Sequence, residues 1–155
     1  MNKTNAMRLL DQAGIAYQAH EYPVDDGQLD AVSVAHKLGF APEQCFKTLV
    51  TQSAEHVHYV FVIPGPWELD LKKAATVTDS KSIRLIPLKE LLPLTGYQHG
   101  GCSPVGMKKV FPTFIDETAL LYDWIGVSGG HVGLNLTLDP NALAGLIGAR
   151  MVDLT

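Results

Sequence analysis

The sequence predicts an α/β protein of the α+β class, with a single domain over residues 1–155 and a mixed, mostly antiparallel sheet. Helical and strand-like segments follow one another without strict βαβα alternation. Several of the strand-like segments are joined by links that are too short for a parallel crossover. Of the 155 residues, 46% are hydrophobic and 18% are charged, and this is enough to form one compact core.

The N-terminal half begins with a helix and contains a hairpin. Thr4 and Asn5 can cap a helix, and Gly14 can end it in the left-handed conformation. Further along, two apolar segments flank the short polar linker Ser53-Ala54-Glu55, which predicts a β-hairpin. The other expected elements of this half are a helix at Asp30 to Leu38, a helical turn at Pro42 to Gln44, and strands at Ile15 to Tyr22, Phe46 to Gln52 and His56 to Pro64.

The C-terminal half contains shorter elements. Pro64-Gly65-Pro66 breaks the chain after the hairpin, and Asp139-Pro140 places an N-cap before a proline at the first helical position. The expected elements are helices at Leu69 to Ala75, Leu88 to Leu94 and Pro140 to Ile147, and strands at Ile83 to Ile86, Thr113 to Asp116, Leu120 to Ser128, Gly133 to Leu138 and Arg150 to Leu154.

Composition argues against several classes of protein. A net charge of −4 disfavours binding to nucleic acid by bulk electrostatics, so any such contact must be local. Cys45 and Cys102 are too few for a disulfide framework or a structural zinc site. Met1 to Gly14 contains neither a signal-peptide core nor a long apolar run. We therefore expect a cytoplasmic protein without a membrane partner.

A lysine and a glycine-rich loop together predict an active site. Lys47 lies in the apolar run Cys45 to Val50, where its ammonium group must reach water or find a partner. The loop Gly100 to Gly106 allows backbone amides to approach a ligand without an intervening Cβ. A cation combined with exposed amides suits an ester carbonyl, a ribose or a phosphate.

Other interpretations of these residues stay open at this point. Lys47 can be an edge-strand lysine that discourages aggregation, and the glycine-rich loop can be a turn without a ligand. A Cys102 nucleophile is conceivable because two lysines follow it in the sequence. His56 and His58 could bind a metal, but an exposed hairpin face is the better interpretation, so no metal site is predicted.

Five motifs follow one another along nearly the whole chain. They are Tyr22, Lys47-Thr48-Leu49, Leu69-Asp70-Leu71-Lys72-Lys73, Gly100-Gly101-Cys102-Ser103-Pro104-Val105-Gly106 and Val127-Ser128-Gly129-Gly130. In this order they resemble the YbaK/EbsC family of aminoacyl-tRNA deacylases, which are free-standing relatives of the editing domain of bacterial prolyl-tRNA synthetases. Within that family, the chain is most similar to the Cys-tRNA(Pro) deacylases.

The resemblance implies a fold, an activity and a set of site residues. The implied fold is a mixed sheet that closes toward a barrel, with helices around it. The implied activity removes a wrong amino acid from the 3′ end of tRNA without a metal or an organic cofactor. Catalytic roles are implied for Lys47, Gly100 and Gly101. Substrate-binding roles are implied for Tyr22, Thr48, Ser103, Pro104, Ser128, Gly129 and Asn135.

The expected function is trans-editing, the removal of cysteine from mischarged Cys-tRNA(Pro), with the ester positioned for attack by the thiol of the substrate itself. The resemblance also implies contact with the CCA end of the tRNA and an association with prolyl-tRNA synthetase. Asn135 stands where relatives often have an acid, and the Asp25-Asp26-Gly27 loop is shorter than in cysteine-specific members. Deacylation of Ala- or Ser-tRNA and a non-catalytic tRNA- or nucleotide-binding module are therefore alternatives.

Overall fold

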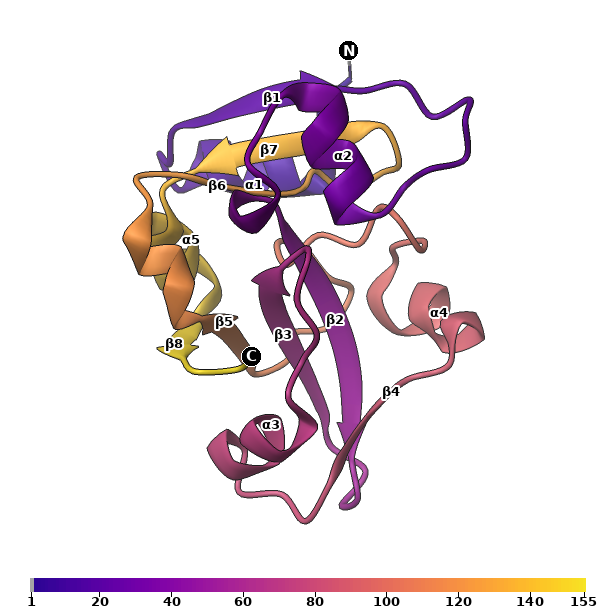
Figure 1. Cartoon of the computed structure of the whole chain (residues 1–155), viewed down its shortest axis with the longest axis vertical. Coiled ribbons are helices and arrows are strands. Elements are labelled where there is room, and N and C mark those ends of the chain that lie inside the picture. Colours follow the sequence, from indigo (N-terminus) through magenta and orange to yellow (C-terminus); the bar gives the residue numbers. More distant parts are fainter. Residues whose placement is uncertain (1) are drawn as a thin grey trace.

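The computed structural model describes residues 2–155, which form two β-sheets with helices around them (Figure 1). The smaller sheet is antiparallel, and its strands in spatial order are β1 (Tyr17–Glu21), β7 (Leu134–Leu138) and β6 (Ile125–Ser128). The larger sheet has the order β4 (Ile83–Leu85), β2 (Phe46–Ser53), β3 (His58–Pro64), β5 (Thr113–Asp116) and β8 (Arg150–Val152). It is mixed, because β3 pairs with β5 and β5 with β8 in parallel.

The helices begin where the sequence supplies capping side chains. Thr4 and Asp139 accept hydrogen bonds from main-chain amides of the first turns that they precede, which confirms both predicted caps. The α-helices are α1 (Asn5–Gln12), α2 (Ala31–Leu38), α3 (Leu71–Val77), α4 (Leu91–Thr95) and α5 (Pro140–Ile147). The 3-10 helices are η1 (Pro42–Gln44), η2 (Leu88–Glu90) and η3 (Glu117–Leu121). None of the helices within residues 2–155 has the length and apolar character needed to cross a membrane.

The predicted hairpin is confirmed as the antiparallel pair β2 and β3, in a register that runs from Phe46 opposite Pro64 to Gln52 opposite His58. The second strand starts two residues later than predicted. His56 has a φ of +66° and lies in the turn. A left-handed residue of this kind cannot continue a strand, so His56 and His58 do not form a paired face.

The predicted strand over Leu120 to Ser128 is wrong in its first half. Residues Glu117 to Leu121 form η3, and the strand begins only at Ile125. The Asp116 carboxylate accepts hydrogen bonds from the amide and the hydroxyl of Thr118, which favours a helical turn at this point. Leu121 is 77% exposed, so this apolar residue does not belong to a buried strand.

Closure toward a barrel is also wrong, because the two sheets stay separate. A barrel requires continuous strand pairing around its circumference. Here β6 is an edge of the smaller sheet, and in the described part of the chain a single isolated bridge, between Cys45 and Gly126, joins it to the residue just before β2. The mixed α/β character that the sequence predicted is confirmed.

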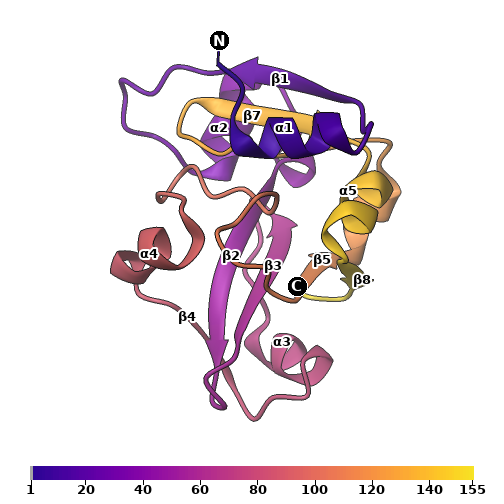
Figure 2. The ribbon, with the colours of Figure 1, turned by 180° about the vertical axis from the view of Figure 1, so that it is seen from behind.

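The β2–β3 hairpin connects the two ends of the molecule, with the smaller sheet at one end and α3 at the other (Figure 1). Helices α1 and α2 cover opposite faces of the smaller sheet, as the front and back views together show (Figure 2). Strand β3 is buried on both faces: Val60 and Val62 join the main core, whereas Phe61 and Ile63 join a second cluster with Ala74 of α3.

We expect the contact between the two sheets to tolerate no side chain at Gly126. A Cβ at this position would lie 2.8 Å from Asn135 Oδ1 and 3.7 Å from Cys45 Sγ. Gly126→Ala should therefore lower the free energy of unfolding by about 1–3 kcal/mol, through overpacking. Urea denaturation of the purified protein measures this change.

Gly145→Ala is the matched control, because a Cβ at this position in α5 meets nothing within 4 Å. It should raise the stability by about 0.5–1 kcal/mol, since alanine is the better helix former. Equal effects of the two substitutions would contradict the close approach at Gly126.

Candidate active site

A pocket of about 210 Å³ lies where the start of β2, the segment before α2 and the glycine-rich loop meet. Six of the predicted site residues line it. They are Tyr22, Lys47, Thr48, Gly100, Ser128 and Asn135. These residues come from both sheets and from two loops, so only the folded chain brings them together.

Lys47 brings to the pocket a cation that pairs with no carboxylate of residues 2–155. It lies at the second position of β2 and is half-buried, and Nζ donates a hydrogen bond to the carbonyl oxygen of Gly65 at 3.0 Å. Within residues 2–155, Lys47 forms no ion pair. Strand β4 covers β2 only from Thr51 to Ser53, so the edge of β2 at Lys47 stays open on that side. The ammonium group therefore has donors left for a ligand.

Two buried polar atoms at the pocket lack hydrogen-bond partners among the described residues. They are Oγ1 of Thr48 and Oδ1 of Asn135. Asn135 is only 4% exposed, and its Nδ2 lies 3.9 Å from Cys45 Sγ. Buried polar groups in folded proteins are nearly always paired, so these two atoms are candidates for hydrogen bonds to a bound substrate.

The glycine-rich loop contributes Gly100 and Cys102 to the pocket lining. Gly100 has a φ of +85°, a conformation that glycine adopts at little cost. The Gly101 amide donates to the carbonyl oxygen of Gln98 at 3.0 Å, whereas the amides of Gly100 and Cys102 donate no hydrogen bond within residues 2–155. Of the loop residues, Gly100 and Cys102 are also the two that line the pocket, so their amides are the candidates to serve an anionic oxygen there.

Four predicted site residues lie outside the pocket lining. Gly101 packs against the neighbouring loop, where a Cβ would lie 2.8 Å from the amide nitrogen of Val132. The buried Ser103 hydroxyl accepts a hydrogen bond from Val105, and Pro104 lines a different surface hollow. At Gly129 a Cβ would come within 2.5 Å of the Leu134 side chain. In this structure these residues shape the two loops.

Sequence reasoning missed part of the pocket wall. The missed residues are Leu29, Asp30 and Val34, whereas His99 and Cys102, which also line the pocket, lie beside the predicted Gly100. Asp30 is also the N-cap of α2, and its carboxylate accepts from the amide of Ser33 at 3.1 Å. The sequence predicted a helix from Asp30 to Leu38, but which side of that helix faces Lys47 depends on the tertiary fold.

The two cysteines of the pocket are poor nucleophiles. Burial raises the pKa of Cys45 to about 11 and that of Cys102 to about 12. Both thiols are protonated at neutral pH, whereas thiol chemistry requires the thiolate. The arrangement therefore disfavours a Cys102 nucleophile. No cluster of three or more His, Cys, Asp or Glu side chains suited to a metal ion occurs within residues 2–155.

Comparison with known proteins identifies the family. A sequence profile of the aminoacyl-tRNA editing domain family matches residues 26–146. The chain belongs to this family. EbsC of Enterococcus faecalis, a proposed Cys-tRNA(Pro)/Cys-tRNA(Cys) deacylase, is 43% identical over 153 residues, which cover 99% of this chain and 93% of EbsC. The predicted family is thus confirmed, and with it the expected class of enzyme, an aminoacyl-tRNA deacylase.

Solved structures share the fold of this editing-family member. The crystal structure of a protein proposed as a trans-editing enzyme for prolyl tRNA synthetase has a TM-score of 0.85 and 28% identity, with 99% of both chains covered. A hypothetical protein with 23% identity has a TM-score of 0.86 and covers 95% of this chain and 96% of its own. The second likeness concerns the fold alone.

We expect the buried thiols to weaken the fold at high pH. On unfolding, each thiol returns to its ordinary pKa near 9.0, so the unfolded chain releases protons first as the pH rises. The stability that these thiols contribute is complete below pH 9 and is lost as the pH rises toward their folded pKa values. Between pH 8 and pH 10, urea denaturation should show a loss of about 1 kcal/mol per thiol. The Cys45→Ala/Cys102→Ala variant should lose less stability than the wild type over this pH range. An identical loss in the variant would show that the two thiols do not cause it.

Proposed function

We propose that this chain is a cytoplasmic trans-editing deacylase that removes cysteine from mischarged Cys-tRNA(Pro). The observation that supports it most is the position of Lys47, a cation without a carboxylate partner in the lining of a pocket that also contains Gly100. EbsC, proposed to act on the same kind of substrate, matches nearly the full chain. The size of the pocket also fits, because about 210 Å³ is less than the roughly 300–1,000 Å³ of sites for larger ligands.

The proposed chemistry depends on charge stabilisation. When a nucleophile attacks the aminoacyl ester, negative charge develops on the carbonyl oxygen. The free amides of Gly100 and Cys102 can donate to this oxygen, and the Lys47 ammonium can add a positive charge near it. The amides belong to a loop held in place by its packing, so they need little reorganisation during the reaction.

The nucleophile in this proposal belongs to the substrate. The sulfur of the cysteinyl group attacks its own carbonyl carbon, a C–S bond forms, and the ester C–O bond to the tRNA breaks. The proton of the thiol ends on the 3′ or 2′ oxygen of the terminal ribose, and the resulting thiolactone reacts with water to give cysteine. The protein orients the group for this step, which converts a slow bimolecular reaction into an intramolecular one.

Three polar side chains can hold the aminoacyl group in this orientation. The unpaired Thr48 Oγ1 and Asn135 Oδ1 can both accept hydrogen bonds, which suits the α-ammonium group of an amino acid. The Ser128 hydroxyl, which accepts a hydrogen bond from the amide of Gly130 at 3.3 Å, keeps its own proton available. The Asn135 side chain accepts a hydrogen bond as a neutral amide, whereas an acidic residue at this position would bring a negative charge into the pocket.

The tRNA itself would be held weakly by this protein alone. The net charge of −4 repels a polyanion, so contact is confined to the CCA end near Lys47. We propose that prolyl-tRNA synthetase supplies the remaining affinity for the tRNA. The structural likeness to a protein proposed as a trans-editing enzyme for that synthetase supports this partner.

Lys47→Met should abolish most of the deacylation, because it removes the cation and keeps the apolar stem. We expect kcat/KM for Cys-tRNA(Pro) to fall by roughly 10²–10³-fold, the usual effect of losing a donor to a developing oxyanion. Release of labelled cysteine from purified Cys-tRNA(Pro) measures the rate.

Lys81→Met is the matched control, since Lys81 is exposed near β4 and lies outside the pocket lining. Its kcat/KM for Cys-tRNA(Pro) should equal that of the wild type. Ala-tRNA(Pro), Ser-tRNA and S-methylcysteinyl-tRNA(Pro) serve as further substrates. Release of these at the rate of cysteine would contradict attack by the substrate thiol, and full activity of Lys47→Met would refute the proposed site.

Thr48→Val should separate stability from activity. The substitution keeps the shape of the side chain and removes a buried hydroxyl that lacks a partner. We expect the free energy of unfolding to rise by about 1 kcal/mol, because the desolvated hydroxyl no longer has to be accommodated. The KM for Cys-tRNA(Pro) should rise, since the hydrogen bond to the substrate is lost. Lower stability with an unchanged KM would show that Thr48 serves the fold alone.

A further inference from the structure

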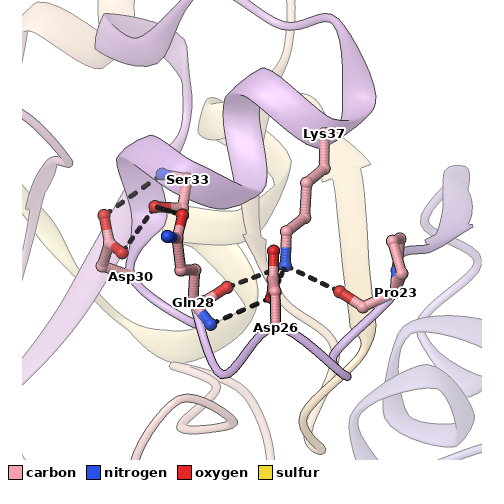
Figure 3. Close-up of polar contacts among 6 residues, drawn as sticks. All are labelled: Pro23, Asp26, Gln28, Asp30, Ser33 and Lys37. Carbon is pink, nitrogen blue, oxygen red and sulfur yellow. Dashed lines mark hydrogen bonds and ion pairs between the residues drawn. The ribbon is translucent and has the colours of Figure 1, made fainter.

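Lys37 binds the segment Pro23 to Asp30 at three points (Figure 3). It lies in the last turn of α2, and its side chain extends back toward the segment that precedes the helix. Nζ donates to the carbonyl oxygen of Pro23 at 2.7 Å, to Oδ1 of Asp26 at 2.7 Å and to the carbonyl oxygen of Gln28 at 2.9 Å. An ammonium group has three protons, and each has an acceptor here.

These contacts differ from those of an ordinary surface ion pair. The Lys37 side chain is only 13% exposed, whereas Lys3, which pairs with Asp11 on the surface, is 55% exposed. Asp26 Oδ1 also accepts from the amide of Gln28 at 3.0 Å, so one carboxylate joins the lysine to the turn. Charge-assisted bonds of low exposure hold a loop more firmly than an exposed pair does.

The segment that Lys37 holds is one wall of the pocket. Leu29 and Asp30 line it, and the ring of Tyr22, just before the segment, has its centroid 5.8 Å from Lys37 Nζ. Leu29 lies against the glycine-rich loop, since a Cβ built on Gly100 would come within 3.1 Å of Leu29 Cβ. The position of Leu29 therefore sets how closely this wall approaches Gly100.

We propose that Lys37 is a positioning residue for the editing reaction: it fixes the Pro23 to Asp30 wall against Gly100 and so sets the fit of the aminoacyl group. This inference rests on the proposed function for its kinetic consequence, but the attachment of the wall can be measured without it. Lys37 itself does not line the pocket, so it acts through Leu29, Asp30 and Tyr22.

The test compares Lys37→Met with the wild type in two measurements. In the first, the KM for Cys-tRNA(Pro) should rise on the order of tenfold while kcat changes much less, because a looser wall weakens the fit of the substrate and leaves Lys47 in place. In the second, hydrogen exchange at the amides of Gly27 and Gln28 should become about tenfold faster, with α2 unaffected. These two amides form hydrogen bonds within the segment.

Lys3→Met is the matched control, because it removes a lysine that pairs with an aspartate away from the pocket. It should change neither measurement. Asp26→Asn is a second variant, at a more exposed position. It should raise the KM and speed up the hydrogen exchange by smaller factors than Lys37→Met does. It replaces Lys37→Met as the test if that variant does not fold.

Three results would overturn the inference. One is wild-type KM and exchange in Lys37→Met. Another is a fall in kcat with an unchanged KM. The third is faster exchange throughout α2, which would make Lys37 a residue of the fold alone. If the wild type releases no amino acid from Cys-tRNA(Pro), the proposed function fails, and hydrogen exchange at Gly27 and Gln28 still tests whether Lys37 holds the wall.

Discussion

The close approach of the two sheets at Cys45 and Gly126 is the constraint on which the site depends. The smaller sheet supplies Ser128 and Asn135, and the larger sheet supplies Lys47 and Thr48. Because Gly126 has no side chain, the Asn135 carboxamide fits between the sheets beside Cys45. A closed barrel would have filled this junction with paired strands. The incomplete pairing therefore leaves space for a pocket.

The buried core and the candidate site lie in different parts of the chain. Strand β3 is apolar on both faces and is buried between two clusters, so it supports the hairpin without touching the pocket. Strand β2 is less buried at Lys47, Thr48 and Leu49, where it lines the pocket. One buried side-chain atom without a partner, Thr48 Oγ1, occurs there, and none occurs in the described part of β3. Such local costs are typical of functional sites.

Elements with local causes were predictable from the sequence. Thr4 and Asp139 cap their helices through their own side chains, and the hairpin follows from two apolar runs around a short polar linker. Lys47 was noticeable because a lysine in an apolar strand requires an explanation. The wall formed by Leu29 and Asp30 was not predictable, since it depends on how α2 packs on the smaller sheet. The strand predicted from Leu120 was wrong because Leu120 and Leu121 are apolar but lie exposed on the surface.

Lys47 has a consequence for the way in which tRNA reaches this protein. The molecule as a whole is acidic, yet one ammonium group in the pocket lining has no counter-ion among residues 2–155. At long range a polyanion meets net repulsion, and near the pocket it meets local attraction. Dissolved salt screens both fields. If the CCA end binds at Lys47 as proposed, higher ionic strength eases the encounter with tRNA and at the same time weakens the hold on the CCA end, so salt has opposite effects on the two steps of binding.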